Sequence, residues 1–202
     1  MFKRLIIIGA GGPARVVADI AMKSGRSDIA LLDDAVSGEV MGFPVIGKLA
    51  DAAMLADPDT EFIAAVGSCQ MRRSITEALH LPWATLIHPS AQIGADVSIG
   101  EGTVVMANAV INPCASVGRH CIINTAAVVE HNDRLGDWVH ISPRAALGGT
   151  VTVGDMTHIG IGAAVRNNTD ICGGCVIGAG AAVVKSITEV GTYAGVPARR
   201  IK

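Results

Sequence analysis

The sequence predicts an α/β domain followed by a triangular β-helix, and two patterns support this. From Ile87 to Thr188 the 102 residues divide into seventeen consecutive blocks of six without an insertion or deletion, and every block opens with Ile, Val or Leu. The fifth residue of each block is small, with Asp133 and Ile187 as the departures. Such a short, fixed period is typical of a solenoid, whose repeats bury their apolar faces against their neighbours. Before this region, short apolar runs alternate with helix-like segments.

The N-terminal region is expected to contain three strands and two helices. The apolar runs Leu5–Ile8 and Ile29–Leu32 are interpreted as buried strands, and Glu61–Val66 as a third. Helices are expected at Pro13–Lys23, directly after a glycine turn, and at Met71–His80. Strands that alternate with helices predict a small parallel sheet with helices on its faces.

The repeat region predicts a stack of coils. Three blocks of six make one 18-residue coil, and coils of this kind stack as parallel strands about 4.8 Å apart. The seventeen blocks make between five and six coils, so we expect a prism roughly 27 Å tall. After Thr188 the period stops, and residues 193–200 are expected to form an exposed loop that caps the stack. The predicted domains are residues 1–86 and 87–202.

Composition and charge argue against several classes of protein. The net charge is −2 over 202 residues and Lys and Arg form no basic stripe, so nothing indicates a nucleic-acid partner. The apolar run after Met1–Arg4 is too short for a signal peptide, and no stretch is long enough to span a membrane. The five cysteines form no disulfide framework, which predicts a reduced, cytoplasmic setting. For the pair Cys172 and Cys175 a structural role is favoured over metal or redox chemistry, because Cys175 fills a small fifth position.

The block Val129–Arg134 breaks the repeat with four charged or ionisable residues. Asp133 stands where the neighbouring coils have Ala115 and Val151. A carboxylate at an inward position is unfavourable unless it is hydrogen-bonded or paired. Asp133 therefore either serves chemistry or is turned outward by a bulge.

His131 lies in the same block and is the candidate general base. A stacking distance of 18 residues places Gly148 beside Glu130 and Gly149 beside His131, which predicts an open shelf next to the imidazole. Glycines also occur at solenoid corners for backbone reasons alone. A histidine can take the proton from an amine or hydroxyl that attacks a thioester, an adjacent acid or amide can fix its tautomer, and a backbone N–H could hold the developing oxyanion.

The other histidines lie outside this break. His140 and His158 are 18 residues apart and are expected to stack on successive coils. No acidic residue or cysteine shares their column, so a surface ladder is favoured over a metal site. His88 and His120 are interpreted as structural, and His80 ends a helix, where a cation interacts favourably with the helix dipole.

The glycine turn Gly9–Ala14 follows a strand and opens a helix, which is the setting of phosphate binding by helical N–H groups. Read as G-x-G-x-x-A, with Asp33 further on, the turn could hold NAD, but the domain is too small for a full two-halved dinucleotide-binding fold. A third interpretation is that the glycines serve only tight packing of the strand against the helix.

The block pattern [Ile/Val/Leu]-[Gly]-x-x-[small]-x resembles the hexapeptide-repeat acyltransferases. The motif Asn124-Thr125-x-x-x-Val129-Glu130-His131, followed by Gly136 and His140, resembles one branch of this family. That branch comprises the bacterial nucleotide-linked 4-amino-sugar N-acetyltransferases and the related sialic-acid-type O-acetyltransferases. The resemblance implies a left-handed parallel β-helix, a homotrimer, acetyl-CoA as cosubstrate, and direct transfer without a metal.

The resemblance also implies roles for single residues, with His131 as the base. In relatives the next residue is often acidic and tunes the base, whereas here it is Asn132, followed by Asp133. This departure leaves open whether Asp133, Glu130 or neither supplies the tuning. The residues that match the acetyl-CoA groove are His140, Gly149, Ile161 and Ala179, with the segment 195–199 near the CoA tail. Those that match the nucleotide-sugar site are Gly11, Gly12, Pro13, Asp33, Asp34 and Gly67, and many relatives have a histidine where Pro13 stands.

These observations predict an acetyl-CoA-dependent N-acetyltransferase that acts on the 4-amino group of a nucleotide-linked 4-amino-4,6-dideoxy sugar, with no nucleic-acid or membrane partner. The closest alternative is a sugar O-acetyltransferase of the sialic-acid type with the same base. A non-catalytic, sugar-nucleotide-binding trimer is an alternative from another class, and an NAD-dependent activity of the first domain is a third.

Overall fold

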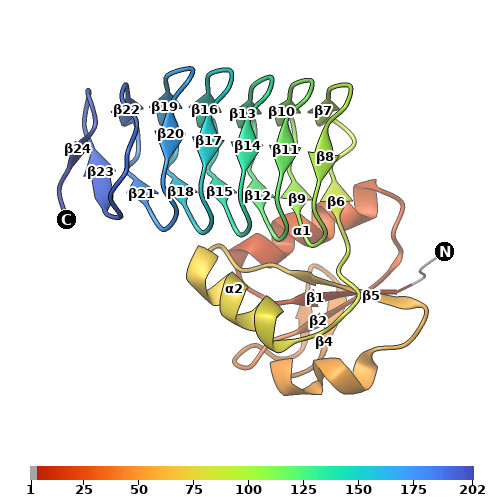
Figure 1. The fold of residues 1–202 in the computed structure, drawn as a ribbon. Coiled ribbons are helices and arrows are strands. Elements are labelled where there is room, and N and C mark those ends of the chain that lie inside the picture. The colour runs from red at the N-terminus through yellow and green to blue at the C-terminus, as the bar shows by residue number, and fades with distance from the viewer. Residues whose placement is uncertain (1–3) are drawn as a thin grey trace.

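The computed structural model describes residues 4–202 and confirms the predicted fold class, an α/β domain followed by a left-handed β-helix (Figure 1). Met1, Phe2 and Lys3, part of the basic start considered for a signal peptide, lie outside the described residues. The two α-helices, α1 (Gly12–Lys23) and α2 (Cys69–Ala78), are 12 and 10 residues long, and no helix in the described part of the chain could span a membrane.

The N-terminal domain is a five-stranded sheet with the strand order β3-β4-β2-β1-β5. Its pairs are parallel except for the β3–β4 pair. The strands are β1 (Arg4–Ile8), β2 (Asp28–Leu32), β3 (Glu39–Val40), β4 (Phe43–Gly47) and β5 (Thr60–Ala64), and the helices are α1 (Gly12–Lys23), the 3₁₀-helix η1 (Leu49–Leu55) and α2 (Cys69–Ala78).

Several predicted boundaries were wrong, and β3, β4 and η1 were not predicted. The third predicted strand ends at Ala64 and not at Val66, and α2 begins at Cys69, two residues before the predicted start. The Ser68 side chain explains the early start, because its hydroxyl accepts a hydrogen bond from the Met71 N–H at 3.3 Å and caps the helix.

The β-helix has three faces, each a parallel sheet, which we name after their first strands. The β7 sheet contains β7 (Gln92–Ile93), β10 (Val110–Ile111), β13 (Val128–Val129), β16 (Ala146–Leu147), β19 (Ala164–Val165) and β22 (Ala182–Val183). The β8 sheet contains β8 (Ser98–Ile99), β11 (Ser116–Val117), β14 (Arg134–Leu135), β17 (Thr152–Val153) and β20 (Asp170–Ile171).

The third face, the β6 sheet, is the longest. It contains β6 (Leu86–Ile87), β9 (Val104–Val105), β12 (Ile122–Ile123), β15 (His140–Ile141), β18 (His158–Ile159), β21 (Val176–Ile177), β23 (Thr192–Ala194) and β24 (Arg199–Arg200). The predicted capping loop is instead a hairpin, since β23 pairs in parallel with β21 and β24 pairs antiparallel with β23. The hairpin therefore extends this face beyond the last block.

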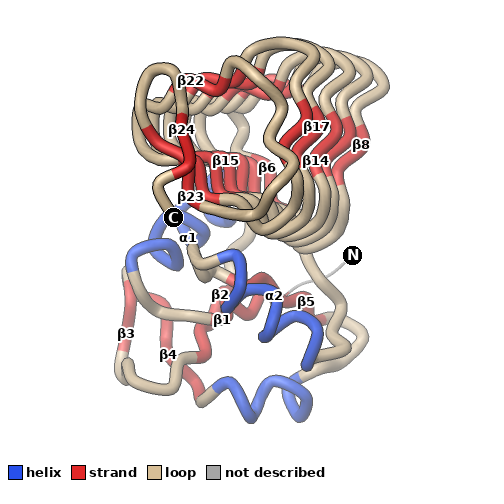
Figure 2. Tube along the Cα trace, turned by 60° about the vertical axis from the view of Figure 1, so that its left-hand side comes forward, coloured by secondary structure: helices blue, strands red, loops and turns tan. Residues whose placement is uncertain are grey.

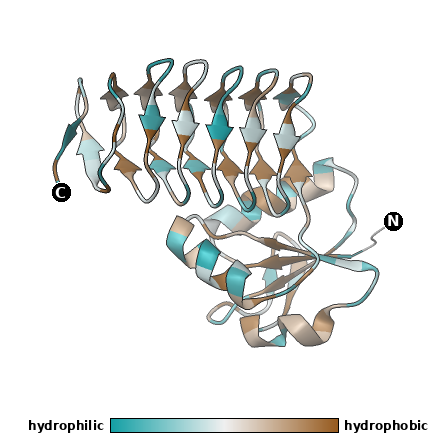
Figure 3. Cartoon of the chain, viewed as in Figure 1, coloured by the Kyte–Doolittle hydropathy of each residue, from teal (hydrophilic) through white to brown (hydrophobic). Residues whose placement is uncertain are grey.

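The strand register confirms stacking by 18 residues. Ile111 lies beside Val129 and His140 beside His158, each one coil apart. The first and fifth positions of the blocks both point into the prism, where they form one aliphatic core, as Ile111 and Ala109 illustrate. Outward positions of the β8 sheet include hydrophilic residues, which make β14 and β20 stand out in Figure 3.

The corners of the prism share a backbone feature that the sequence pattern did not reveal. The fourth residue of most blocks has a positive φ, for example 62° at Asn132 and 55° at Trp138. This left-handed conformation turns the chain from one face to the next. The residue before it, at the third position, projects from the corner, and His131 and Gly149 occupy this position in successive coils.

The N-terminal domain packs against the β6 sheet (Figure 2). Helix α1 lies between the small sheet and the first coils, where Val17 and Ile20 share a core with Val104 and Ile122. The other side of the small sheet packs against η1 and α2 in a second cluster that includes Phe62. Phe62 also pairs with Trp83 in a parallel bridge that joins the sheet to the connector.

Candidate active site

His131 projects from the corner between the β7 sheet and the β8 sheet, in the turn that joins β13 to β14. Its side chain is exposed. The turn is held on both sides, because the His131 N–H donates to Glu130 Oε2 at 2.9 Å and the His131 carbonyl accepts from the Thr150 N–H at 3.0 Å. The exposed imidazole therefore stands on a fixed backbone.

Asn132 fixes the tautomer of this imidazole. Its Oδ1 lies 3.0 Å from His131 Nδ1. An amide oxygen can only accept a hydrogen bond, so this geometry assigns the proton to Nδ1 and leaves the lone pair of Nε2 free. Asn132 also suits its own position, since asparagine tolerates the left-handed conformation better than most residues.

Asp133 points into the prism and is fully buried, which answers the question of its orientation. Its Oδ2 accepts a hydrogen bond from the Glu130 N–H and its Oδ1 one from the Val151 N–H, both at 2.8 Å. Neither oxygen is among the partners of the His131 ring. Burial raises the pKa of the Asp133 carboxyl to about 6, against these two hydrogen bonds.

The same inward slot is used for hydrogen bonding elsewhere in the prism. Thr103 Oγ1 accepts from the Cys121 N–H at 3.0 Å, and Thr157 Oγ1 accepts from the Cys175 N–H at 3.3 Å. In each case the donor is one coil further on, as it is for Asp133 and Val151. Asp133 therefore ties adjacent coils and shapes the His131 turn, and the structure places it behind the imidazole rather than against it.

Gly149 forms the shelf beside the imidazole. A Cβ atom built at Gly149 would lie 2.5 Å from His131 Nε2, closer than real side chains approach. Among residues 4–202 the Gly149 N–H has no hydrogen-bond acceptor. The corner thus combines an unshielded ring nitrogen, an open space beside it, and a backbone donor without a partner.

His140 lies on the β6 sheet, away from His131. Its ring stacks on that of His158 with centroids 4.7 Å apart. Its Nδ1 lies 3.2 Å from the Gly67 carbonyl, and its Nε2 lies 3.1 Å from Asn124 Nδ2. A carbonyl accepts and an amide nitrogen donates, so the ring carries its proton on Nδ1 and both nitrogens are used.

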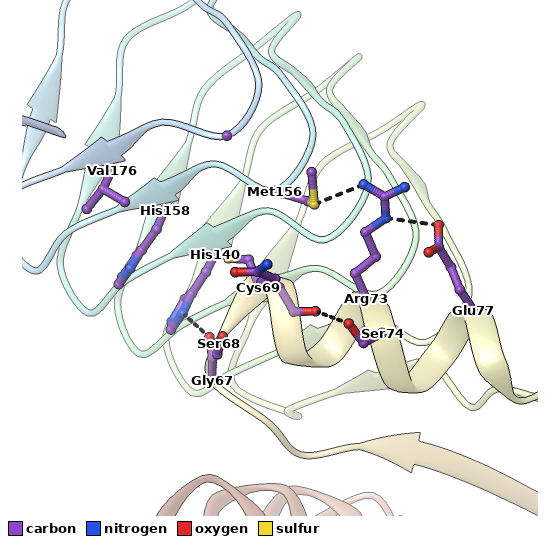
Figure 4. A pocket seen from close by; sticks show the side chains of 12 residues that line it. Gly67, Ser68, Cys69, Arg73, Ser74, Glu77, His140, Met156, His158 and Val176 are labelled. Carbon is purple, nitrogen blue, oxygen red and sulfur yellow. Dashed lines mark hydrogen bonds and ion pairs between the residues drawn. The ribbon is translucent and has the colours of Figure 1, made fainter. Parts of the chain in front are cut away.

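The His140–His158 pair forms the stacked ladder that the sequence predicted, but it is half-buried, because the N-terminal domain partly covers it. Burial, followed by the charges of His158 and Arg72, lowers the pKa of His140 to about 4. The two rings line a cleft of about 910 Å³ between α2 and the β6 sheet (Figure 4). Across the cleft lie Ser68, the N-cap of α2, and the α2 residues Arg73 and Glu77.

The predicted nucleotide-sugar residues gather at the carboxyl ends of β1, β2 and β5. Gly11 and Gly12 are exposed at the start of α1, whose first turn has no side-chain cap. Pro13 and Gly67 are neighbours, since a Cβ at Gly67 would lie 4.0 Å from Pro13 Cγ. The uncapped N–H groups of α1 thus face the same edge as the Gly67 turn, which suits a phosphate.

The two aspartates of this edge are held by backbone groups. Asp33 Oδ2 accepts from the Ala10 N–H at 2.7 Å, and Oδ1 accepts from the N–H groups of Ala35 and Val36. These hydrogen bonds, the Ala35 one first, keep the pKa of Asp33 below its usual value despite partial burial. Asp34 Oδ1 accepts from the Leu49 N–H at 3.0 Å. Both carboxylates shape the loops beside the glycine turn.

Ile161 and Ala179 lie at a third location. They occupy one column on the corner between the β6 sheet and the β7 sheet, and Ile161 is 55% exposed. One chain therefore places the predicted residues in three separate groups: the His131 corner, the cleft beside His140 with the nucleotide-sugar edge, and the Ile161 corner. In residues 4–202, no three His, Cys, Asp or Glu side chains are grouped as metal ligands would be.

Sequence reasoning missed three residues that do not line the cleft but hold its walls in place. Asn124 appeared only as part of a motif, although it orients His140. Trp138 reaches from the prism to α2, where its Nε1 donates to Thr76 Oγ1 at 2.9 Å. Arg72 is buried in α2, on the same helical stripe as the other two buried residues of this helix, Cys69 and Thr76. Nothing in the sequence marks this stripe as the buried one.

Comparison with known proteins covers both halves of the chain. A family model described as the PglD N-terminal domain matches residues 4–79, and one described as the GMPPB C-terminal domain matches residues 75–161. The curated UDP-N-acetylbacillosamine N-acetyltransferase of Bacillus subtilis (strain 168) is 41% identical over 114 residues. That match covers 52% of each protein, so the aligned part spans about half the length of this relative.

Solved structures match the whole chain. The acetyltransferase domain of PglB from Neisseria gonorrhoeae FA1090 is 41% identical, with a TM-score of 0.95 over 98% of this chain and 100% of that domain. The same domain in complex with acetyl coenzyme A has a TM-score of 0.96 and 40% identity over all of both chains. PerB from Caulobacter crescentus, solved with CoA and GDP-perosamine, is 34% identical, with a TM-score of 0.94 over 98% of this chain and 97% of that one.

Proposed function

This chain belongs to the hexapeptide-repeat acyltransferases, in the branch of nucleotide-sugar N-acetyltransferases, and we propose that it transfers the acetyl group of acetyl-CoA to the 4-amino group of a nucleotide-linked 4-amino-4,6-dideoxy sugar. The curated relative is named as an N-acetyltransferase of UDP-N-acetylbacillosamine, and PerB was solved with GDP-perosamine, and both compounds are nucleotide-linked amino sugars. The single observation that carries the proposal is the free Nε2 of His131 beside the Gly149 shelf.

His131 is the proposed general base. The amine attacks the thioester carbonyl carbon, a new C–N bond forms, and Nε2 takes the proton that the nitrogen loses. The C–S bond then breaks, the amide is released, and the thiolate of CoA leaves and takes the proton from Nε2, which regenerates the neutral imidazole. Asn132 keeps Nδ1 protonated throughout, so that Nε2 remains the accepting nitrogen.

Gly149 is proposed to stabilise the transition state. Its unpartnered N–H is next to the base, where the carbonyl oxygen of the thioester acquires negative charge. A fixed backbone donor at such a point stabilises the oxyanion without reorganisation. Asp133 is proposed to act without contacting the imidazole, because its carboxylate accepts a hydrogen bond from the Glu130 N–H and so fixes the turn that carries His131.

The nucleotide part of the acceptor is proposed to bind in residues 1–86, at the edge formed by Gly11, Gly12, Pro13, Asp33, Asp34 and Gly67. The uncapped start of α1 supplies N–H groups for phosphate oxygens. The cleft beside His140 continues from Gly67 toward Val176 and offers room for the sugar and the pantetheine arm. Residues 87–202 carry the acetyl transfer.

A second copy of the chain is needed to complete this site. The N-terminal domain sits on the β6 sheet (Figure 2). His131 lies between β13 and β14, at the corner where the other two sheets meet. We propose a homotrimer in which the His131 corner of one prism faces the His140 cleft of its neighbour, with acetyl-CoA between the two prisms. Ile161 and Ala179 would then line the groove from the adjoining corner.

We also propose a cytoplasmic setting. All five cysteines, Cys69, Cys114, Cys121, Cys172 and Cys175, are free thiols, and Cys172 Sγ lies 3.4 Å from Cys175 Sγ without a bond. Free thiols this close are characteristic of a reducing compartment.

The direct test is release of the CoA thiol with a panel of acceptors. We expect turnover with UDP- or GDP-linked 4-amino sugars and none with sialic acid or other hydroxyl acceptors. Turnover restricted to hydroxyl acceptors would establish the O-acetyltransferase instead, and absence of thiol release with every acceptor would favour a binding trimer.

The shared site has its own test. His131→Ala and Gly67→Arg each remove one side of the proposed interface and should each be inactive. Mixing the two after unfolding and refolding together should restore about one quarter of the wild-type activity, because in a heterologous ring one interface in four combines both intact sides. A mixture that stays inactive contradicts the shared site.

A further inference from the structure

Arg72 is the largest side chain in the described chain that is buried almost completely, with 1% of its surface exposed. It lies in the first turn of α2, between the N-terminal domain and the prism. No carboxylate is among its hydrogen-bond partners in residues 4–202. A buried guanidinium stays charged and needs its N–H groups satisfied, so its partners show what it is for.

The partners of Arg72 come from both domains. On the N-terminal side, Nη1 donates to the carbonyls of Val66 and Gly67 at 2.8 and 3.2 Å. On the prism side, Nε donates to the His120 carbonyl at 2.7 Å, and Nη2 donates to the Trp138 carbonyl at 2.9 Å. His120 and Trp138 are 18 residues apart and lie in successive coils, so one side chain ties the Gly67 turn to two coils.

The Gly67 turn is the junction between the two parts of the proposed site. The Gly67 carbonyl accepts from Arg72 and also lies 3.2 Å from His140 Nδ1. Pro13 and the start of α1 stand beside Gly67 on its other side. A shift of this turn would therefore move the nucleotide-binding edge relative to the cleft in which transfer takes place.

We propose that Arg72 is a positioning residue that sets where the acceptor sugar lies relative to the acetyl group, by fixing the Gly67 turn to the coils that carry His120 and Trp138. The proposal rests on the function proposed above and extends it to a residue outside the pocket. Arg72 touches neither substrate, and its influence passes through the Gly67 carbonyl and His140.

The charge of Arg72 supports the same role. His140 and His158 both have a lowered pKa, for which burial is the first cause and the Arg72 charge a contributing one. A neutral His140 keeps its proton on Nδ1 and can share the Gly67 carbonyl with Arg72. The other groups that face His140 are the Asn124 amide and the His158 ring, and the Arg73–Glu77 ion pair lies across the cleft.

The test compares steady-state kinetics of Arg72→Met and Arg72→Lys with those of the wild type. Met fills the space without donors, and we expect kcat/KM for the nucleotide sugar to fall about 100-fold, because a displacement of about 1 Å has consequences of that size. The KM for acetyl-CoA should change much less than kcat/KM for the sugar, because only the pantetheine arm of CoA is proposed to enter the cleft beside His140. Lys keeps the charge and part of the hydrogen bonding, so kcat/KM of Arg72→Lys for the nucleotide sugar should lie between the values of the wild type and of Arg72→Met.

Arg26→Met is the matched control. Like Arg72, Arg26 is an arginine of the N-terminal domain with a largely buried side chain. Its ion pair with Glu61, however, stays within that domain. Its loss should lower stability without changing either KM. If Arg72→Met does not fold, the same kinetic comparison of the two substrates is made with Arg72→Lys. An unchanged kcat/KM for the sugar in a folded variant, or a change in the KM for acetyl-CoA as large as the fall in kcat/KM for the sugar, would overturn the proposal.

A second readout follows the histidine directly. In NMR titrations, Arg72→Met should raise the pKa of His140 above its wild-type value of about 4, because a neighbouring positive charge is removed. An unchanged value would contradict the coupling. This measurement needs no turnover, so it also separates the two proposals: if no acceptor is acetylated, the proposed function fails while the position of Arg72 can still be assessed.

Discussion

His131 and His140 belong to the same solenoid but have opposite surroundings. His131 is exposed at a corner, and one ring nitrogen is held by Asn132 while the other is free. His140 lies under α2 with both nitrogens engaged and its ring stacked on His158. The difference shows that the repeat can present a histidine either with a free ring nitrogen or as a wall of the cleft, depending on whether the residue stands at a corner or within a strand.

Replacing each histidine with asparagine is the strongest test of this contrast. His131→Asn should lower kcat about 1,000-fold, within the range of a lost general base, whereas His140→Asn should change kcat less than about tenfold and act mainly on KM. Steady-state kinetics of the two purified variants check this. Comparable losses of kcat would show that the two rings are not distinct in role.

Gly149→Ala tests the space beside the base. The new methyl group would lie 2.5 Å from His131 Nε2, so the ring must turn away from the acceptor. We expect a loss of kcat of about 100-fold from this misplacement. The double variant His131→Ala, Gly149→Ala should be no slower than His131→Ala alone, since the clashing ring is absent. Additive losses in the double variant would show that Gly149 acts independently of the ring.

Asn132→Ala tests the tautomer. Without the amide oxygen, the proton is free to move between the two ring nitrogens, and we expect kcat to fall about tenfold. Asn108→Ala is the matched control, because Asn108 has the same kind of positive φ, 58° against 62°, at a corner without a histidine. Both variants should lose similar stability in thermal unfolding. Equal effects on kcat would assign the loss to backbone strain.

The smallest expected effect is on the pH dependence of stability. Burial lowers the pKa values of His120 and His140 to about 4 from 6.5, so the unfolded chain binds more protons between these values. Their contribution to stability is present above pH 6.5 and is lost as the pH falls toward 4. Asp133, whose pKa is raised to about 6, acts in the opposite direction, because the folded state retains its proton.

The loss of stability from the two histidines on acidification is larger than the gain from the one carboxyl. We therefore expect Tm to be about 5 °C lower at pH 5 than at pH 7. Calorimetry of the wild type checks this, and His140→Gln should flatten the dependence. A Tm that stays constant or rises on acidification would contradict the assigned burial of the two histidine rings.

The prism could be predicted from the sequence because its rule is local. Each six-residue block repeats the same buried positions, so the pairing of His140 with His158 follows from counting by 18. The break at His131 could be found for the same reason, since only a regular pattern makes an exception visible. Asp133 could be placed in an inward slot, but its two backbone partners depend on corner geometry that the pattern does not encode.

The junction between the two domains could not be predicted in this way. Arg72 reads as an ordinary charged residue of a short amphipathic helix, and only the carbonyls of His120 and Trp138, far away in sequence, explain its burial. The stacking of His140 on His158 was predicted, but the partial cover that α2 gives this pair was not, for the same reason. Contacts between the α/β domain and the β-helix do not alter the hydrophobic pattern of either domain, so the sequence pattern does not reveal them.

The inward slot of Asp133 has a consequence for engineering. Since Thr103 and Thr157 fill the same block position at another corner of the prism and make the same kind of link to the next coil, the proposed reactive corner is a short insert in a uniform scaffold. Transplanting Glu130–Asp133, together with a glycine one coil further on, into another coil of the same corner should transfer the proposed acetyltransferase site to that coil. The height of the active corner along the prism would then become a design variable, adjustable in steps of one coil.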